Sequence, residues 1–224
     1  MLEIVTTADG SNTIFNVEVG EHYHSTHGAL QESRHVFIQS GLVYFLENNP
    51  SAKSVSILEV GFGTGLDFLL SADHCQQNNI RLDYVGIEAY PLSPGMIIST
   101  GYDQYLSAAT WKNFIEKYEQ ALISPVDLNL QCQLQIARRK LLDFKANRQF
   151  DIIYFDAFAS ARQPEMWDDA AIGHTVQFLK PGGVFVTYAI TGNLKRALKA
   201  VGCKVEKAPG APGKREMLRA VKIG

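Results

Sequence analysis

Residues 57–65 read Ile57-Leu58-Glu59-Val60-Gly61-Phe62-Gly63-Thr64-Gly65, and this stretch decides the fold. Its first half is an apolar run typical of a buried strand, and its second half has glycine at alternate positions. Glycine has no Cβ, so alternate glycines let the backbone turn tightly and come within contact distance of a ligand. The apolar residues 66–70 that follow indicate a helix. A strand that passes through a glycine-rich loop into a helix predicts a nucleotide-binding α/β fold.

The glycine spacing and the acid before it distinguish between two kinds of cofactor. Loops that hold a pyrophosphate have glycine at the first, third and sixth places, whereas the sixth place here is Leu66. A carboxylate at position 59 would also repel a phosphate. S-adenosylmethionine has an ammonium and a sulfonium group and no phosphate, so an acidic loop suits it. We therefore expect S-adenosylmethionine to contact Glu59, Gly61, Phe62, Gly63, Thr64 and Gly65.

A second acid follows the next expected strand. Residues 82–88 form an apolar run that ends in Glu88. An acid at the end of the second strand of such a unit can accept hydrogen bonds from both ribose hydroxyls of an adenosine. Dinucleotide-binding proteins use the same arrangement, so Glu88 predicts an adenosine without selecting the cofactor.

Length and composition predict one domain over residues 1–224. The chain is 46% hydrophobic, which is enough to bury a full core. We expect residues 1–50 to be a strand and helix extension, and residues 51–224 to be the cofactor-binding core. No apolar run approaches the roughly 20 residues of a membrane helix, and the amino terminus lacks the pattern of a signal peptide. The expected location is therefore the cytoplasm.

Cysteine and histidine usage predicts no metal site. Cys75, Cys132 and Cys203 are far apart in the sequence and form none of the close pairs that zinc sites use, so we expect buried free thiols. Three histidines do lie close together in residues 22–27, but no matching pair of ligands follows later in the chain. We therefore expect no metal.

The charge is unevenly distributed. The chain has a net charge of −2, but residues 195–224 carry +7 and residues 1–194 carry −9. A basic tail on an acidic body suits contact with phosphates. The alternative is a solvated helix and strand edge, and charge alone does not decide between them.

The order of the expected elements indicates the architecture. Strands are expected at residues 13–19, 55–60, 82–88, 129–136, 150–156, 183–189, 204–207 and 217–221. Helices are expected at residues 29–48, 65–77, after Pro91, and at 111–122, 164–179 and 192–201. This alternation predicts a Rossmann-like, mostly parallel seven-stranded sheet, and the last two strands form an antiparallel edge hairpin. That plan is typical of class I methyltransferases.

Several motifs resemble one known family. They are residues 21–25, 28–30, 32–33, 35–37, 156–159 and 164–167, and the tail Pro212-Gly213-Lys214-Arg215-Glu216-Met217-Leu218-Arg219. Together they resemble the methyltransferase half of the MnmC family, over nearly the whole chain. The resemblance implies S-adenosylmethionine-dependent methylation of the primary amine of 5-aminomethyluridine, or of its 2-thio form, at the tRNA wobble position. The product would be 5-methylaminomethyluridine.

The resemblance also implies roles for individual residues. Glu59 and the glycines would hold the methionine end of the cofactor and Glu88 its ribose. Asp143, after a strand-like stretch at residues 137–142, would lie near its adenine. Asp156, after the strand 150–156, would be the catalytic acid beside the reacting amine. The expected substrate contacts are Tyr23, His24, Phe158, Trp167, Lys214 and Arg215. Structural roles remain open for all of these, such as a helix-capping acid at Asp156 and core aromatics at Phe158 and Trp167.

The sequence departs from the family in two places. Asp67 stands where the family more often has Asn, and 224 residues leave no room for the flavin domain that makes the aminomethyl group. We therefore expect a stand-alone methyltransferase supplied by a separate enzyme. Three alternatives remain open. They are a class I methyltransferase that acts on a small-molecule or protein amine, an aminopropyltransferase of related fold, and a non-catalytic tRNA-binding protein.

Overall fold

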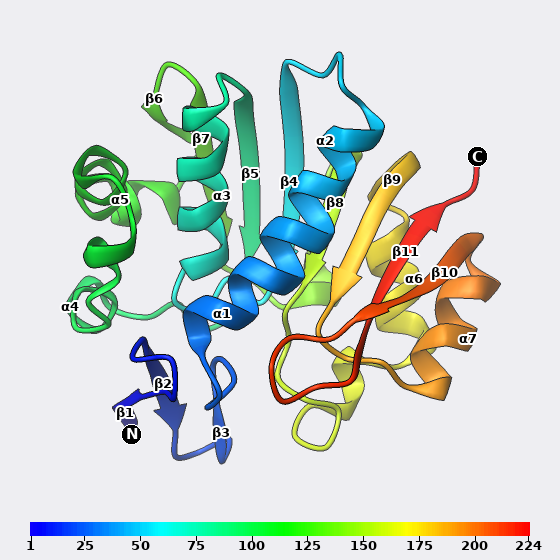
Figure 1. Cartoon of the computed structure of the whole chain (residues 1–224), viewed down its shortest axis with the longest axis horizontal. Helices are drawn as coiled ribbons and strands as arrows, with labels where there is room; N and C mark the ends of the chain where they lie inside the picture. The colour runs from blue at the N-terminus through cyan, green and yellow to red at the C-terminus, as the bar shows by residue number, and fades with distance from the viewer.

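An eight-stranded sheet organises the fold in this computed structural model, which describes residues 1–224 (Figure 1). The strand order is β10 (Cys203–Pro209), β11 (Glu216–Lys222), β9 (Leu179–Thr187), β8 (Phe150–Phe155), β4 (Ser54–Val60), β5 (Arg81–Ile87), β7 (Cys132–Ala137) and β6 (Val126–Asn129). The five strands from β9 to β7 are parallel, and β11 and β10 form the expected antiparallel edge hairpin. The expected mostly parallel sheet is therefore confirmed.

The eighth strand corrects the expected count of seven. Residues 129–136 were expected to form one strand, but β6 and β7 form an antiparallel hairpin with a turn at Leu130 and Gln131. The side chain of Asn129 accepts a hydrogen bond from the Gln131 N–H at 2.8 Å, and Leu130 is fully exposed. A side-chain oxygen that binds the backbone two residues later favours a turn over an extended strand.

Two further segments differ from the expectation. The helix expected at residues 164–179 is a 3₁₀ turn, η4 (Pro164–Met166), followed by α6 (Asp169–Val176). The carboxylate of Asp168 caps α6 by accepting a hydrogen bond from the Ala171 N–H at 2.7 Å, which places the helix start after residue 168. Asp143 does not follow a strand directly, because residues 141–143 form a 3₁₀ turn, η3 (Leu141–Asp143).

Helices cover both faces of the sheet. One face packs against α3 (Leu66–Gln77), α5 (Ala108–Ala121) and a continuous helix of α1 (Ala29–Ser33), the π-helical η1 (Arg34–Val43) and α2 (Tyr44–Asn48). Figure 1 shows this long helix crossing in front of β8 and β4. The opposite face packs against α6 and α7 (Gly192–Ala200). Two apolar cores result, one on each face of the sheet, because successive strand residues point to opposite sides.

A separate small sheet lies beside the edge toward which β5 and β9 point (Figure 1). It consists of β1 (Leu2–Thr6), β2 (Asn12–Asn16) and β3 (Glu21–His22), all antiparallel. The remaining elements are α4 (Pro94–Ile98) and the 3₁₀ turn η2 (Tyr102–Tyr105). The Tyr102 hydroxyl donates to the backbone carbonyl of Asn12 at 2.9 Å, which attaches the small sheet to the main body.

All three cysteines are free and buried, as expected. None of the helices combines the length and the apolar character needed to cross a bilayer.

Candidate functional site

The glycine loop lies across the carboxyl ends of three parallel strands. The Gly61 N–H donates to the carbonyl of Ile87 at the end of β5 at 3.0 Å, and the Asp156 N–H donates to the carbonyl of Val60 at 2.8 Å. Gly61 has a φ of +87°, and a Cβ at this position would overlap the carbonyl oxygen of Asp156. Only glycine therefore allows β4, β5 and β8 to end at one point. This is the edge where open α/β sheets bind their ligands.

Glu88 is oriented toward this loop by two backbone donors. Its Oε2 accepts a hydrogen bond from the Gly63 N–H at 3.0 Å, and its Oε1 accepts one from the Tyr90 N–H at 2.9 Å. Each carboxylate oxygen has a second acceptor position. Glu88 therefore combines a fixed position with capacity for two further donors, as a ribose ligand requires. Its assignment to the ribose stays a prediction.

Two carboxyl groups are buried beneath the loop. Glu59 is 1% exposed, and its Oε2 accepts a hydrogen bond from the Tyr84 hydroxyl at 2.9 Å. Asp67, in the first turn of α3, is 2% exposed, and neither of its oxygens has a hydrogen-bond partner. Burial, together with the nearby carboxylates of Asp67 and Asp156, raises the pKa of Glu59 well above its usual range. Burial, with Glu32 nearby, raises the pKa of Asp67 to about 7.

Asp156 follows β8 directly and is half-buried at the same edge. Its carboxylate accepts no hydrogen bond from the protein, although Lys214 is close enough to lower its pKa. Burial is the largest cause that raises the pKa of Asp156 well above its usual range, and the carboxylates of Asp67 and Glu32 add to it. A carboxyl group whose pKa is raised in this way holds a proton more readily than an exposed carboxylate does.

Glu32, Glu59, Asp67 and Asp156 form what we call the acidic cluster. Lys214 is the cation bound directly to it, through an ion pair with Glu32 at 2.6 Å. Burial and mutual repulsion favour the protonated forms of Glu59, Asp67 and Asp156, and a cation bound beside them would favour their ionised forms. Glu32 and Asp67 were not among the expected site residues. Two features of the sequence could have identified them. Glu32 lies in one of the motifs shared with the resembled family, and Asp67 stands where that family more often has Asn.

The segment after β3 covers the glycine loop. The Tyr23 ring lies edge-on to Phe158, with centroids 5.1 Å apart, and it comes within 2.9 Å of the position that a Cβ of Gly63 would occupy. His24 is buried and joins the extension to the loop, because its two ring nitrogens contact the hydroxyls of Thr13 at 3.2 Å and Thr64 at 3.5 Å. Burial lowers the pKa of His24 to about 4, so this imidazole is neutral at pH 7.

The loop after β8 is held from both sides. The Glu21 carboxylate of β3 accepts a hydrogen bond from the Ala159 N–H at 3.1 Å, and the Tyr188 hydroxyl donates to the carbonyl of Ala157 at 2.9 Å. Neither Glu21 nor Tyr188 was expected. Tyr188 directly follows β9, and a polar aromatic residue at the carboxyl end of a parallel strand was the signal that could have identified it.

Two aromatic side chains occupy the core and not the site. Trp167 is buried between Phe155 and Tyr188, and its indole N–H donates to the carbonyl of Phe158 at 2.8 Å. The expectation that Trp167 stacks on a substrate base does not agree with this position, because its ring fixes the loop that carries Phe158. The ring of Phe62 is also buried, which leaves its backbone as the part that faces a ligand.

The remaining expected residues make few contacts. The Lys214 ammonium lies 3.9 Å from the centroid of the Tyr188 ring in addition to its ion pair with Glu32, whereas Arg215 is exposed. Asp143 is exposed on η3 and makes no side-chain contact. The roles expected for Tyr23, His24, Asp143, Phe158, Lys214 and Arg215 in binding stay predictions.

Comparison with known proteins identifies the family. A family described as S-adenosyl-L-methionine-dependent methyltransferase matches residues 102–223. The chain is also 29% identical over 220 residues to the tRNA 5-methylaminomethyl-2-thiouridine biosynthesis bifunctional protein MnmC of Methylobacillus flagellatus, which covers 91% of this chain and 33% of that protein. The chain therefore spans about a third of the length of the curated relatives it matches.

Solved structures agree on the fold. The crystal structure of MnmC2 from Aquifex aeolicus superimposes with a TM-score of 0.76 at 24% identity, over 98% of this chain and 70% of that chain. The structure of DesVI from Streptomyces venezuelae gives a TM-score of 0.52 at 14% identity, over 86% of this chain and 92% of that chain. The fold is that of the class I methyltransferases. The chain belongs to the family of S-adenosyl-L-methionine-dependent methyltransferases.

Proposed function

We propose that this protein methylates the primary amine of 5-aminomethyluridine, or of its 2-thio form, at the wobble position of tRNA, giving 5-methylaminomethyluridine. The names of the similar proteins place them in 5-methylaminomethyl-2-thiouridine biosynthesis on tRNA, which supports this substrate. Those proteins are about three times as long, so the assignment concerns the part that this chain matches. The acceptor would be a cytoplasmic tRNA, and a separate enzyme would supply the aminomethyl group.

The residues at the sheet edge fit the cofactor. Glu88 has acceptor capacity for two ribose hydroxyls, and Gly61 and Gly63 leave the backbone open to close approach. The pKa values of Glu59 and Asp67 are raised by burial, so a cationic ligand bound beside these carboxyl groups would favour their ionised forms. We also assign Asp143 to the adenine end. When bound, S-adenosylmethionine supplies an electrophilic methyl group on a sulfonium.

One observation carries the proposal, namely that the carboxylate of Asp156 has no hydrogen-bond donor from the protein and has a raised pKa. A primary alkyl amine is mostly protonated near pH 7, and only the neutral form has a lone pair for attack. Asp156 would accept a hydrogen bond from the amine, take or share its excess proton and hold its lone pair toward the methyl group. The cationic amine would in turn favour the ionised form of Asp156 before this proton transfer.

The test is methylation of tRNA isolated from cells that lack the methyl step, with labelled S-adenosylmethionine and identification of the nucleosides by mass spectrometry. We expect label in 5-methylaminomethyluridine or its 2-thio form, at the wobble position alone. Label in another nucleoside would contradict the substrate assignment. Turnover of free amines without tRNA would favour a small-molecule methyltransferase, and tRNA binding without turnover would favour the non-catalytic alternative.

A further inference from the structure

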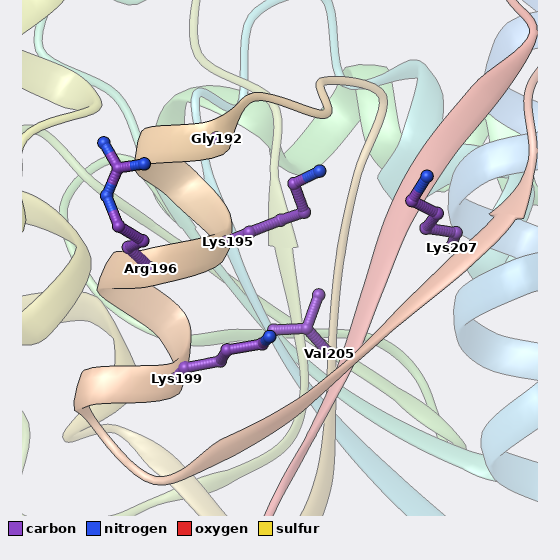
Figure 2. Close-up of a pocket in the computed structure, with 6 residues that line it drawn as sticks. All are labelled: Gly192, Lys195, Arg196, Lys199, Val205 and Lys207. Atoms are coloured by element: carbon purple, nitrogen blue, oxygen red, sulfur yellow. The ribbon is translucent and has the colours of Figure 1, made fainter.

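A basic groove lies between α7 and β10, away from the acidic cluster. Its lining residues are Gly192, Lys195, Arg196 and Lys199 of α7, with Val205 and Lys207 of β10, around a volume of about 390 Å³. Figure 2 shows Lys195 and Lys199 extending from α7 toward the strand that carries Lys207, with Arg196 on the outer side of the helix. We call it the α7–β10 groove. No acidic residue lines it.

The cations of α7 lack the partners that would stabilise them in the free protein. Lys195 and Lys199 make no ion pair, and Arg196 bonds only to the neutral side chain of Asn193. Like charges four residues apart repel each other on a helix, and cations near a helix amino terminus oppose the helix dipole. The first turn of α7 has no acid to offset this. An anionic ligand would remove both unfavourable terms.

The acids of β10 and β11 leave most of this charge unneutralised. Successive residues of β10 point to opposite faces of the sheet, so Val205 and Lys207 face α7 whereas Glu206 faces the other side. Glu206 is bound there by Arg219 at 3.1 Å. Lys207 is the one groove cation with an acid nearby, Glu216 at 3.3 Å.

One end of the groove, at Gly192, lies close in sequence to the carboxyl end of β9, at the sheet edge that carries the candidate site. Helix α7 begins at Gly192, shortly after β9 ends at Thr187. Between them, Tyr188 contacts the carbonyl of Ala157, the residue next to Asp156. A nucleotide whose base reaches Asp156 therefore has neighbours in the chain that can reach α7.

The spacing of the cations suits a polymer. At a rise of about 1.5 Å per residue, Lys195 and Lys199 are about 6 Å apart along the helix axis, so their ammonium groups can contact separate phosphates. We propose that the α7–β10 groove binds successive phosphates of the RNA backbone that flanks the methylated nucleotide. This inference rests on the proposed function for its RNA partner. Within the basic segment 195–224, this groove differs from the part that carries Lys214 and Lys222, because Lys214 pairs with Glu32 and Lys222 donates to the backbone carbonyls of Val176 and Leu179.

The test compares two double variants with the same change of charge. Lys195→Ala/Lys199→Ala removes two groove cations, and Lys53→Ala/Lys112→Ala removes two exposed cations, one before β4 at the opposite edge of the sheet and one on α5. Binding of a labelled RNA anticodon stem-loop is measured by fluorescence anisotropy over a series of salt concentrations. Calorimetry with S-adenosylmethionine and a thermal melt check that the cofactor site and the fold are intact.

We expect the groove variant to bind RNA about tenfold more weakly at low salt, with a slope of log affinity against log salt reduced by about one for each lost contact. The control variant should bind like the wild type, and cofactor affinity should be unchanged in both. An equal loss of RNA affinity in the two double variants, or no RNA binding by the wild type, would overturn the assignment of the groove. Displacement of the RNA by inorganic phosphate at constant ionic strength would also overturn it, in favour of a single-anion site. Groove-dependent RNA binding without methyl transfer would leave the groove assigned and refute the proposed function.

Discussion

Replacing Asp67 with Asn should stabilise the protein, and the gain should grow as the pH rises. Asp67 is buried with no hydrogen-bond partner, and its pKa is raised from 3.8 to about 7. Between these two values the folded protein binds a proton that the unfolded chain has lost. Stability is therefore highest at low pH and falls as the pH rises toward 7.

The size of the effect follows from the pKa values. Each unit of pKa difference is worth about 1.4 kcal/mol, so the full penalty for Asp67 at pH 8 is about 4 kcal/mol. At pH 5 the unfolded side chain is already mostly ionised, so about 2.5 kcal/mol of this penalty develops between pH 5 and pH 8. An Asn side chain does not ionise. The difference in unfolding free energy between Asp67→Asn and the wild type should therefore be larger at pH 8 than at pH 5, by about 2 to 3 kcal/mol.

Urea unfolding of both proteins at pH 5, 6, 7 and 8 measures this difference. Asp169→Asn is the matched control, because Asp169 also lies in the first turn of a helix but is exposed. It should follow the wild-type curve within about 0.5 kcal/mol. If the unfolding free energies of the wild type and Asp67→Asn changed in parallel with pH, Asp67 would not have the raised pKa of a buried carboxyl group. Because the resembled family more often has Asn here, we expect the variant to retain cofactor binding.

Three further variants test other contacts. Glu88→Ala removes charge-assisted hydrogen bonds worth about 1.5 to 3 kcal/mol, so calorimetry should show S-adenosylmethionine binding tenfold to 150-fold more weakly, and a change below about twofold would exclude a ribose role. Gly61→Ala places a Cβ against the carbonyl oxygen of Asp156 at a residue with positive φ. A thermal melt should therefore show that folding stability falls by about 1 to 3 kcal/mol or more. Lys214→Ala leaves Glu32 without its ion pair, so urea unfolding at pH 7 should show that the unfolding free energy falls by about 1 to 3 kcal/mol. A variant as stable as the wild type would argue against that ion pair.

The parts of the fold that follow from local sequence were predicted well. The apolar runs of β4 and β8 could only be buried parallel strands, and the helix at residues 29–48 has the expected bounds. The glycine loop and Asp156 lie together because the parallel strands β4 and β8 end at the same edge of the sheet. These features depend on hydrophobic periodicity and on glycine, which a single sequence displays directly.

The features that were missed depend on contacts between distant residues. The division of residues 126–137 into two strands depends on the side chain of Asn129, which looks like any strand residue until its hydrogen bond is known. The sequence left Trp167 open between a substrate contact and a core residue, because nothing in it shows that Phe155 and Tyr188 enclose this side chain. The acidic cluster joins α1, β4, α3 and the end of β8, so its raised pKa values arise only from the folded packing.

The most direct test of the proposed mechanism is the single-turnover rate of methyl transfer in Asp156→Asn. Wild type and variant are saturated with labelled S-adenosylmethionine and with tRNA that carries 5-aminomethyluridine, and calorimetry reports cofactor affinity separately. The amide keeps the shape of the side chain but cannot take the proton of the amine. We predict cofactor affinity within about tenfold of the wild type, and a rate lower by about 10² to 10⁴. An unchanged rate would contradict the assignment of the amine to Asp156.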